Sequence, residues 1–131
     1  MSLRSKTLEL LRKREQYLQG EGEKAIEKQL SMGKLTARER VLSILDKDSF
    51  QEYDLFVEHE ARDFDMSSKV LYGDGVITGT GTIFGSPVCI FAQDFTVAGG
   101  SLGLMHARKI TKIMDHALKL RIPLIGINDS G

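Results

Sequence analysis

The sequence contains very little cysteine and proline, no tryptophan and no long apolar run. Its 131 residues include one cysteine and two prolines. A single cysteine cannot form an intramolecular disulfide or supply a cysteine metal cluster. Cys89 stands within the apolar segment 88–91, which is typical of a small buried hydrophobe rather than a nucleophile. No apolar segment approaches the roughly 20 residues that cross a membrane.

A net charge is also missing, because 18 basic side chains balance 18 acidic ones. This balance gives no electrostatic reason to expect nucleic acid or a membrane surface as a partner. The charges are nevertheless uneven, with a basic excess over residues 1–40 and an acidic excess over residues 41–75. We interpret the basic segment first as a solvated helical face, with phosphate contact as the alternative. The first residues have no apolar signal core, and we therefore expect a cytoplasmic location.

Periodicity divides the chain into a helical N-terminal arm, residues 1–48, and an α/β part, residues 49–131. The arm combines three predicted helices, at residues 5–18, 23–31 and 37–46, and the third begins at a capping box formed by Thr36 and Glu39. The α/β part has predicted strands at residues 53–57, 76–84, 88–92 and 124–127, and one long helix at residues 101–120. A hairpin, a helix and a further strand make a ββα unit whose last strand is predicted to be parallel.

Two polar turns follow apolar strands, and they are the best candidates for a binding site. Gly99-Gly100-Ser101 (the 99–101 turn) precedes the long helix, and Ser101 is predicted to be its N-cap. Asn128-Asp129-Ser130-Gly131 (the 128–131 turn) follows the last strand. Ligands of α/β proteins bind at such strand ends. For the 99–101 turn, a plain strand-to-helix connection without a ligand is an equally good interpretation. Neither turn matches a dinucleotide fingerprint, a P-loop or a nucleophile elbow.

No convincing set of nucleophile, base or metal ligands is present. His106 and His116 lie ten residues apart on roughly opposed faces of the long helix, where each is more typical of a surface or hydrogen-bonded core histidine. Lys109 is predicted to lie away from the apolar face of that helix. If the protein is an enzyme, we expect backbone N–H groups to stabilise an oxyanion and a substrate or cofactor to supply the base.

Seven segments, in order along residues ~30–131, resemble the biotin-dependent acyl-CoA carboxyltransferases. This is the family of the propionyl-CoA carboxylase β subunit and of the carboxyltransferase subunits of sodium-pump decarboxylases. The segments are Lys34-Leu35-Thr36-Ala37-Arg38-Glu39-Arg40, Gly73-Asp74-Gly75-Val76-Ile77-Thr78-Gly79, Gln93-Asp94-Phe95-Thr96-Val97, Gly99-Gly100-Ser101-Leu102, His106-Ala107-Arg108-Lys109-Ile110, Lys112-Ile113-Met114-Asp115 and Asn128-Asp129-Ser130-Gly131.

The resemblance implies a crotonase-like fold, a spiral of ββα units that is incomplete here, with a helical N-terminal arm. It also implies transfer of a carboxyl group between biotin and the α-carbon of a short acyl-CoA of the propionyl or methylmalonyl type. Biotin would be carried on a partner protein or domain, with biotin carboxyl carrier and biotin carboxylase components as partners. The full-length subunit would form a homo-oligomer, a hexamer. No metal and no side-chain nucleophile are expected.

The resemblance also implies which residues bind acyl-CoA. Gly131 would flank the oxyanion hole, whose own donors would follow in a Gly-Ala-Arg continuation, and no catalytic residue is assigned within the chain. The other expected acyl-CoA-binding residues are Gly99, Gly100, Ser101, Ser130, Lys34, Arg38 and Arg40. The last three would meet the CoA phosphates, and docking of the arm is the alternative role for them. Asp65 and Arg121 stand where relatives usually have glycine.

The family's subunit is expected to be much longer than 131 residues, and three functions for this chain are therefore considered. The first is a fragment of an acyl-CoA carboxylase, covering about half of the first of two carboxyltransferase domains and inactive alone. The second is a fragment of a biotin-dependent sodium-pump decarboxylase subunit. The third is a non-catalytic module that binds CoA or assembles with a full-length partner. The sequence does not distinguish which acyl-CoA is bound.

Overall fold

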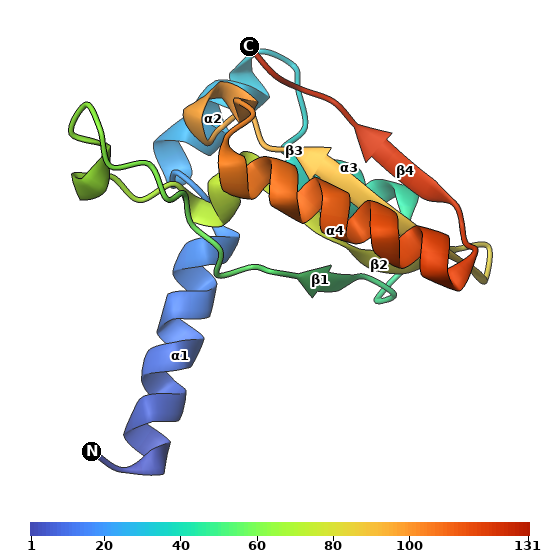
Figure 1. The fold of residues 1–131 in the computed structure, drawn as a ribbon, viewed down its shortest axis with the longest axis horizontal. Helices are drawn as coiled ribbons and strands as arrows, with labels where there is room; N and C mark the ends of the chain where they lie inside the picture. Colours follow the sequence, from blue (N-terminus) through green and yellow to red (C-terminus); the bar gives the residue numbers. More distant parts are fainter.

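A four-stranded sheet forms the centre of the molecule in the computed structural model, which describes residues 1–131 (Figure 1). Strands β2 (Val76–Ile83) and β3 (Ser86–Gln93) form the predicted hairpin, and β1 (Gln51–Tyr53) pairs with β2 in antiparallel register. The last strand, β4 (Leu124–Ile127), runs parallel to β3. This pairing confirms the parallel strand and the ββα unit that the sequence predicts.

Helices cover both faces of the sheet because side chains alternate along β3. Val88, Ile90 and Ala92 face one side and form a core with α3 (Ala37–Ile44), a helix of the arm. Cys89 faces the other side and packs against α4 (Leu104–Leu120). Successive side chains of a strand point to opposite faces of the sheet, so one strand contributes to the cores on both faces. Cys89 is therefore a buried hydrophobe, as its sequence context indicates.

The arm consists of α1 (Leu3–Leu18), α2 (Glu23–Ser31) and α3. The predicted capping box at the start of α3 is present, with the Thr36 hydroxyl accepting from the Glu39 N–H and the Glu39 carboxylate accepting from the Thr36 N–H. Helix α1 extends away from the sheet (Figure 1), and Tyr17 at its end is its one buried residue. No helix of the structure is long and apolar enough to cross a membrane.

The long helix α4 differs from the prediction at its beginning and on its buried face. It begins at Leu104 because residues 98–100 form a short 3₁₀ turn, η3 (Ala98–Gly100), and the chain then runs extended. Lys109, predicted to lie on the polar side, is 3% exposed. Its ammonium group donates to the carbonyls of Gly73, at 2.9 Å, and Val76. These carbonyls belong to η2 (Tyr72–Gly75) and to the start of β2. Tertiary hydrogen bonds therefore place Lys109 in the interior, against the amphipathic pattern of the helix.

The two departures from the family pattern both fall where the backbone is left-handed. Asp65 has φ +59°, and Arg121, the C-cap of α4, has φ +56°. Glycine adopts this conformation without the steric cost that a Cβ atom brings. The two positions therefore keep the conformation that favours glycine even though the sequence does not supply it.

Candidate functional site

The two polar turns that the sequence singles out lie against each other at the carboxyl ends of β3 and β4. The Gly131 N–H donates to the Gly99 carbonyl at 2.9 Å. Gly100, with φ +67°, packs its Cα against the second turn, where an added Cβ would lie 2.2 Å from the Asp129 carbonyl oxygen. This contact requires glycine at position 100 for both its conformation and its size. By contrast, a Cβ at Gly99 would meet nothing within 4 Å.

The N-terminus of α4 is capped by a carboxylate from another segment, and not by Ser101. The Ser101 hydroxyl donates to the Ala98 carbonyl at 2.6 Å, and Gly103 occupies the N-cap position. The Asp74 carboxylate instead accepts from the His106 N–H at 2.9 Å. The predicted N-cap role of Ser101 is therefore wrong, because η2 brings a better acceptor to the helix. This carboxylate occupies a place at which an anionic ligand could otherwise bind.

His106 is fully buried and hydrogen-bonded, which is the second of the two roles that its sequence context leaves open. Its Nδ1 lies 2.9 Å from the Asp74 carbonyl oxygen, and its Nε2 lies 3.4 Å from the Gln93 side-chain nitrogen. A carbonyl only accepts, so Nδ1 carries the proton and Nε2 accepts from Gln93. Burial lowers the pKa of His106, which favours this neutral form. Gln93 is a site residue that sequence reasoning missed, although it begins one of the family-like segments.

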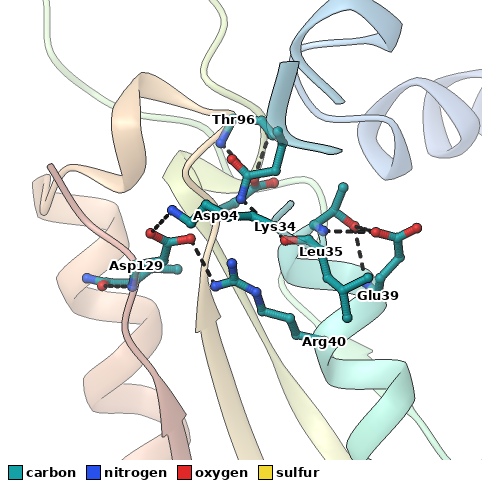
Figure 2. Close-up of polar contacts among 10 residues, drawn as sticks. Lys34, Leu35, Glu39, Arg40, Asp94, Thr96 and Asp129 are labelled. Carbon is teal, nitrogen blue, oxygen red and sulfur yellow. Dashed lines mark hydrogen bonds and ion pairs between the residues drawn. The ribbon is translucent and has the colours of Figure 1, made fainter. Parts of the chain in front are cut away.

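Asp129 joins the 128–131 turn to the arm and to β3 (Figure 2). Its carboxylate forms ion pairs with Lys34 at 2.8 Å and Arg40 at 2.9 Å. Its N–H donates to the side-chain amide oxygen (Oε1) of Gln93 at 2.9 Å. Burial would raise the pKa of the Asp129 carboxyl, but the two cations hold it below its ordinary value. The arm therefore fixes this turn through two charges, and the end of β3 fixes it through one amide.

The three basic residues expected at the CoA phosphates separate into two groups. Lys34 and Arg40 meet at Asp129, and the Lys34 ammonium also lies 4.6 Å from the centre of the Phe95 ring. Arg38 instead forms two hydrogen bonds with Glu52, at 2.7 and 3.0 Å. All three therefore have partners that dock the arm, and contact with CoA phosphates stays a prediction.

Two cavities adjoin these elements. One, of about 420 Å³, lies beside the 99–101 turn and the start of α4. Its mainly apolar lining includes Met66, Leu71, Val97, Ala98, Leu102 and Leu104. The second, of about 240 Å³, lies between the arm and the sheet and includes Arg38 and Glu52 in its wall. Ser130 and Gly131 are exposed at the edge of the site. No group of three or more His, Cys, Asp or Glu side chains is placed to hold a metal ion.

Known proteins share both the sequence and this arrangement. The carboxyl transferase domain matches residues 28–131. The propionyl-CoA carboxylase beta chain of Roseobacter denitrificans is 55% identical over 112 residues, which are 86% of this chain and 22% of that protein. The methylmalonyl-CoA decarboxylase subunit alpha of Veillonella parvula has the same identity and the same coverage. The transcarboxylase 12S hexamer crystallised with methylmalonyl-coenzyme A is 41% identical, with a TM-score of 0.97 over 100% of this chain and 26% of its own.

The fold and the paired backbone turns therefore define a crotonase-like carboxyltransferase domain with a helical N-terminal arm. The chain belongs to the carboxyl transferase domain family. It spans about a quarter of the length of the relatives it matches. The family resemblance and the fold class inferred from the sequence are both confirmed.

Proposed function

We propose that this chain is the acyl-CoA-binding part of a biotin-dependent carboxyltransferase, which moves a carboxyl group between biotin and the α-carbon of a short acyl-CoA. The contact between the 99–101 and 128–131 turns carries the proposal. It brings the two turns together at one sheet edge, beside the position at which the family resemblance expects the main-chain N–H groups that stabilise a thioester enolate. Membership of the family and the methylmalonyl-coenzyme A bound to the 12S relative support the same substrate class.

Within this proposal the chain binds and orients the thioester. Gly131 donates its N–H to Gly99, so its amide shapes the turn and is not the oxyanion donor. The open side of Gly99 and the exposed residues Ser101 and Ser130 line the approach to the site. Biotin supplies the carboxyl group when it is bound. The charged side chains at the 128–131 turn are paired within the chain, so none is assigned to biotin. We infer separately that biotin is carried on a partner protein or domain.

The proposed assembly follows that of the relatives. We infer a homo-oligomer of the complete subunit, a hexamer as in transcarboxylase 12S, working with biotin carboxyl carrier and biotin carboxylase components. A methylmalonyl-CoA decarboxylase role is a second candidate, because the Veillonella relative is as similar as the propionyl-CoA carboxylase chain. An ATP-dependent carboxylation of propionyl-CoA by the assembled enzyme would favour the first role, and decarboxylation of methylmalonyl-CoA without ATP would favour the second.

Calorimetry of the 131-residue chain with propionyl-CoA and with propionyl-pantetheine tests the binding proposal. We expect propionyl-CoA to bind, and its affinity to fall several-fold between about 0.02 M and about 0.2 M salt if basic residues meet its phosphates. Arg38→Met should then weaken propionyl-CoA and leave propionyl-pantetheine unchanged. Lys112→Met, which removes an exposed cation paired with Asp54, is the matched control. Salt-independent binding would leave Arg38 with the docking role alone.

Carboxyl transfer is tested on the complete polypeptide that the gene encodes. Transfer of carboxyl from methylmalonyl-CoA to free biotin is the expected result. Binding of propionyl-CoA without any transfer by that polypeptide would contradict the enzymatic proposal and favour a non-catalytic CoA-binding module. Absence of CoA binding by the chain and by the polypeptide would contradict both.

A further inference from the structure

A continuous path of hydrogen bonds joins four segments that are far apart in the sequence. The Asp74 carbonyl, in η2, accepts from His106 of α4 at 2.9 Å. The other nitrogen of the same imidazole accepts from the Gln93 amide, at the end of β3, across 3.4 Å. The Gln93 oxygen accepts from the Asp129 N–H at 2.9 Å. The link between His106 and Asp74 is buried, and the two links through Gln93 are partly buried.

Backbone groups at the two ends of this path, the Asp74 carbonyl and the Asp129 N–H, fix the direction of its bonds. A backbone carbonyl only accepts, so the Asp74 carbonyl requires the proton of His106 on Nδ1. A neutral imidazole then offers Nε2 as an acceptor, which turns the NH₂ group of Gln93 towards it. The Gln93 oxygen consequently points at Asp129. The tautomer of His106 and the Asp129 N–H therefore require the same orientation of the Gln93 amide.

We propose that His106 and Gln93 are positioning residues that hold the 128–131 turn in the orientation that receives acyl-CoA. Gln93 is the side chain that accepts from the main chain of this turn. The Asp129 carbonyl, on the same residue, packs against Gly100, so a shift of the turn also breaks its contact with the 99–101 turn. The role in receiving acyl-CoA rests on the proposed function, whereas the positioning itself does not.

Protonation of the imidazole would reverse the two hydrogen bonds that the Gln93 side chain makes. Both ring nitrogens would then donate, Gln93 would rotate its oxygen towards His106, and its NH₂ group would face the Asp129 N–H, donor against donor. The Asp74 carboxylate of η2 favours protonation, whereas Lys109, one helical turn along α4, and burial of the ring oppose it. The neutral state that orients the turn is therefore favoured by the surroundings of the ring.

Amide hydrogen exchange of the ligand-free 131-residue chain, measured by NMR, tests the positioning. Gln93→Met keeps the length of the side chain and removes its acceptor, so the Asp129 N–H should exchange about tenfold faster, as expected for one lost hydrogen bond. Gln51→Met is the matched control, because Gln51 is an exposed glutamine of β1. Unchanged exchange of the Asp129 N–H in Gln93→Met would overturn the proposal.

Gln93→Glu separates this role from a general packing defect. A carboxylate still accepts from the Asp129 N–H but requires a donor at His106 Nε2, so protection of that amide should be retained while the His106 imidazole becomes protonated at higher pH. The ¹⁵N shifts of the imidazole report both its tautomer and its titration. A wild-type imidazole protonated on Nε2, or a titration unmoved by Gln93→Glu, would overturn the proposal.

The two proposals fail separately. Loss of Asp129 protection in Gln93→Met, together with no binding of propionyl-CoA by the wild type, would support the positioning and refute the proposed function. Where the complete polypeptide is active, Gln93→Met should lower kcat about tenfold with little change in KM, because orientation of the turn matters most in the transition state. An unchanged kcat would refute the positioning role in catalysis.

Discussion

Two adjacent glycines offer a matched test of the contact between the two turns. Gly99 and Gly100 have nearly equal positive φ angles, +64° and +67°. Alanine in this left-handed region costs about 1–2 kcal/mol at either position. Its effect on the unfolded chain is also the same for both. The difference between Gly99→Ala and Gly100→Ala therefore isolates what the new methyl group meets.

The methyl group of Gly100→Ala would collide with the backbone of the 128–131 turn, which is hydrogen-bonded to Gly99 and Gln93. It would lie 2.2 Å from the Asp129 carbonyl oxygen, whereas the methyl group of Gly99→Ala meets nothing within 4 Å. Relief requires the 128–131 turn to move away, which breaks the bond from Gly131 to Gly99 and the bond from Asp129 to Gln93. At about 1 kcal/mol for each hydrogen bond, Gly100→Ala should cost about 2 kcal/mol more than Gly99→Ala.

Urea denaturation of the wild type and both variants measures this difference. We expect a moderate fall in the free energy of unfolding for Gly99→Ala and a fall of about 3–4 kcal/mol for Gly100→Ala. Equal losses in the two variants would refute the reasoning, because the contact with Asp129 would then contribute nothing. A change in the m-value would mean that the variant alters the compactness of one state, and not the contact alone.

Two further predictions concern the polar groups around α4. Burial lowers the pKa of Lys109 to about 8 from 10.5, so the unfolded chain binds more protons above pH 8; stability should therefore rise by about 2 kcal/mol between about pH 7.5 and about pH 9.5. Urea titrations at both pH values check the rise, which should be absent in Lys109→Met. Asp74→Ala removes the acceptor at the start of α4 and should cost about 1–2 kcal/mol, whereas Asp74→Asn keeps a capping oxygen and should cost less; similar losses in the two variants would contradict the capping role.

Much of the secondary structure could be predicted, because its signals are local. The capping box of Thr36 and Glu39 lies within four residues, and the structure contains it. The apolar, β-branched character of residues 88–92 predicts a strand, and the structure has β3 there. The two glycine-containing turns were recognised from their places after apolar strands, and the parallel pairing of β3 and β4 brings both to one edge.

The failed predictions for Ser101 and Lys109 share one physical cause, which is a hydrogen-bond partner distant in the sequence. Ser101 has the local character of an N-cap, but Asp74, brought to the helix by η2, caps it instead. Lys109 has the local character of an exposed residue, but its position beside η2 and the start of β2 gives its ammonium group two carbonyls to bind. Local propensity is a weak prior wherever tertiary contacts satisfy a polar group better.

The sequence by itself determined most of the helices, three of the four strands, the parallel ββα unit and the family, because periodicity, caps and motifs act between neighbours along the chain. The first strand, β1, lies at Gln51–Tyr53 and not at the predicted residues 53–57. Only the tertiary structure decided what the polar residues of the site do. The ion pair between Lys34 and Asp129 spans 95 positions, and the path from Asp74 through His106 and Gln93 crosses three elements. Such partners are chosen by packing, since a buried polar group must find its hydrogen bond wherever the fold places one.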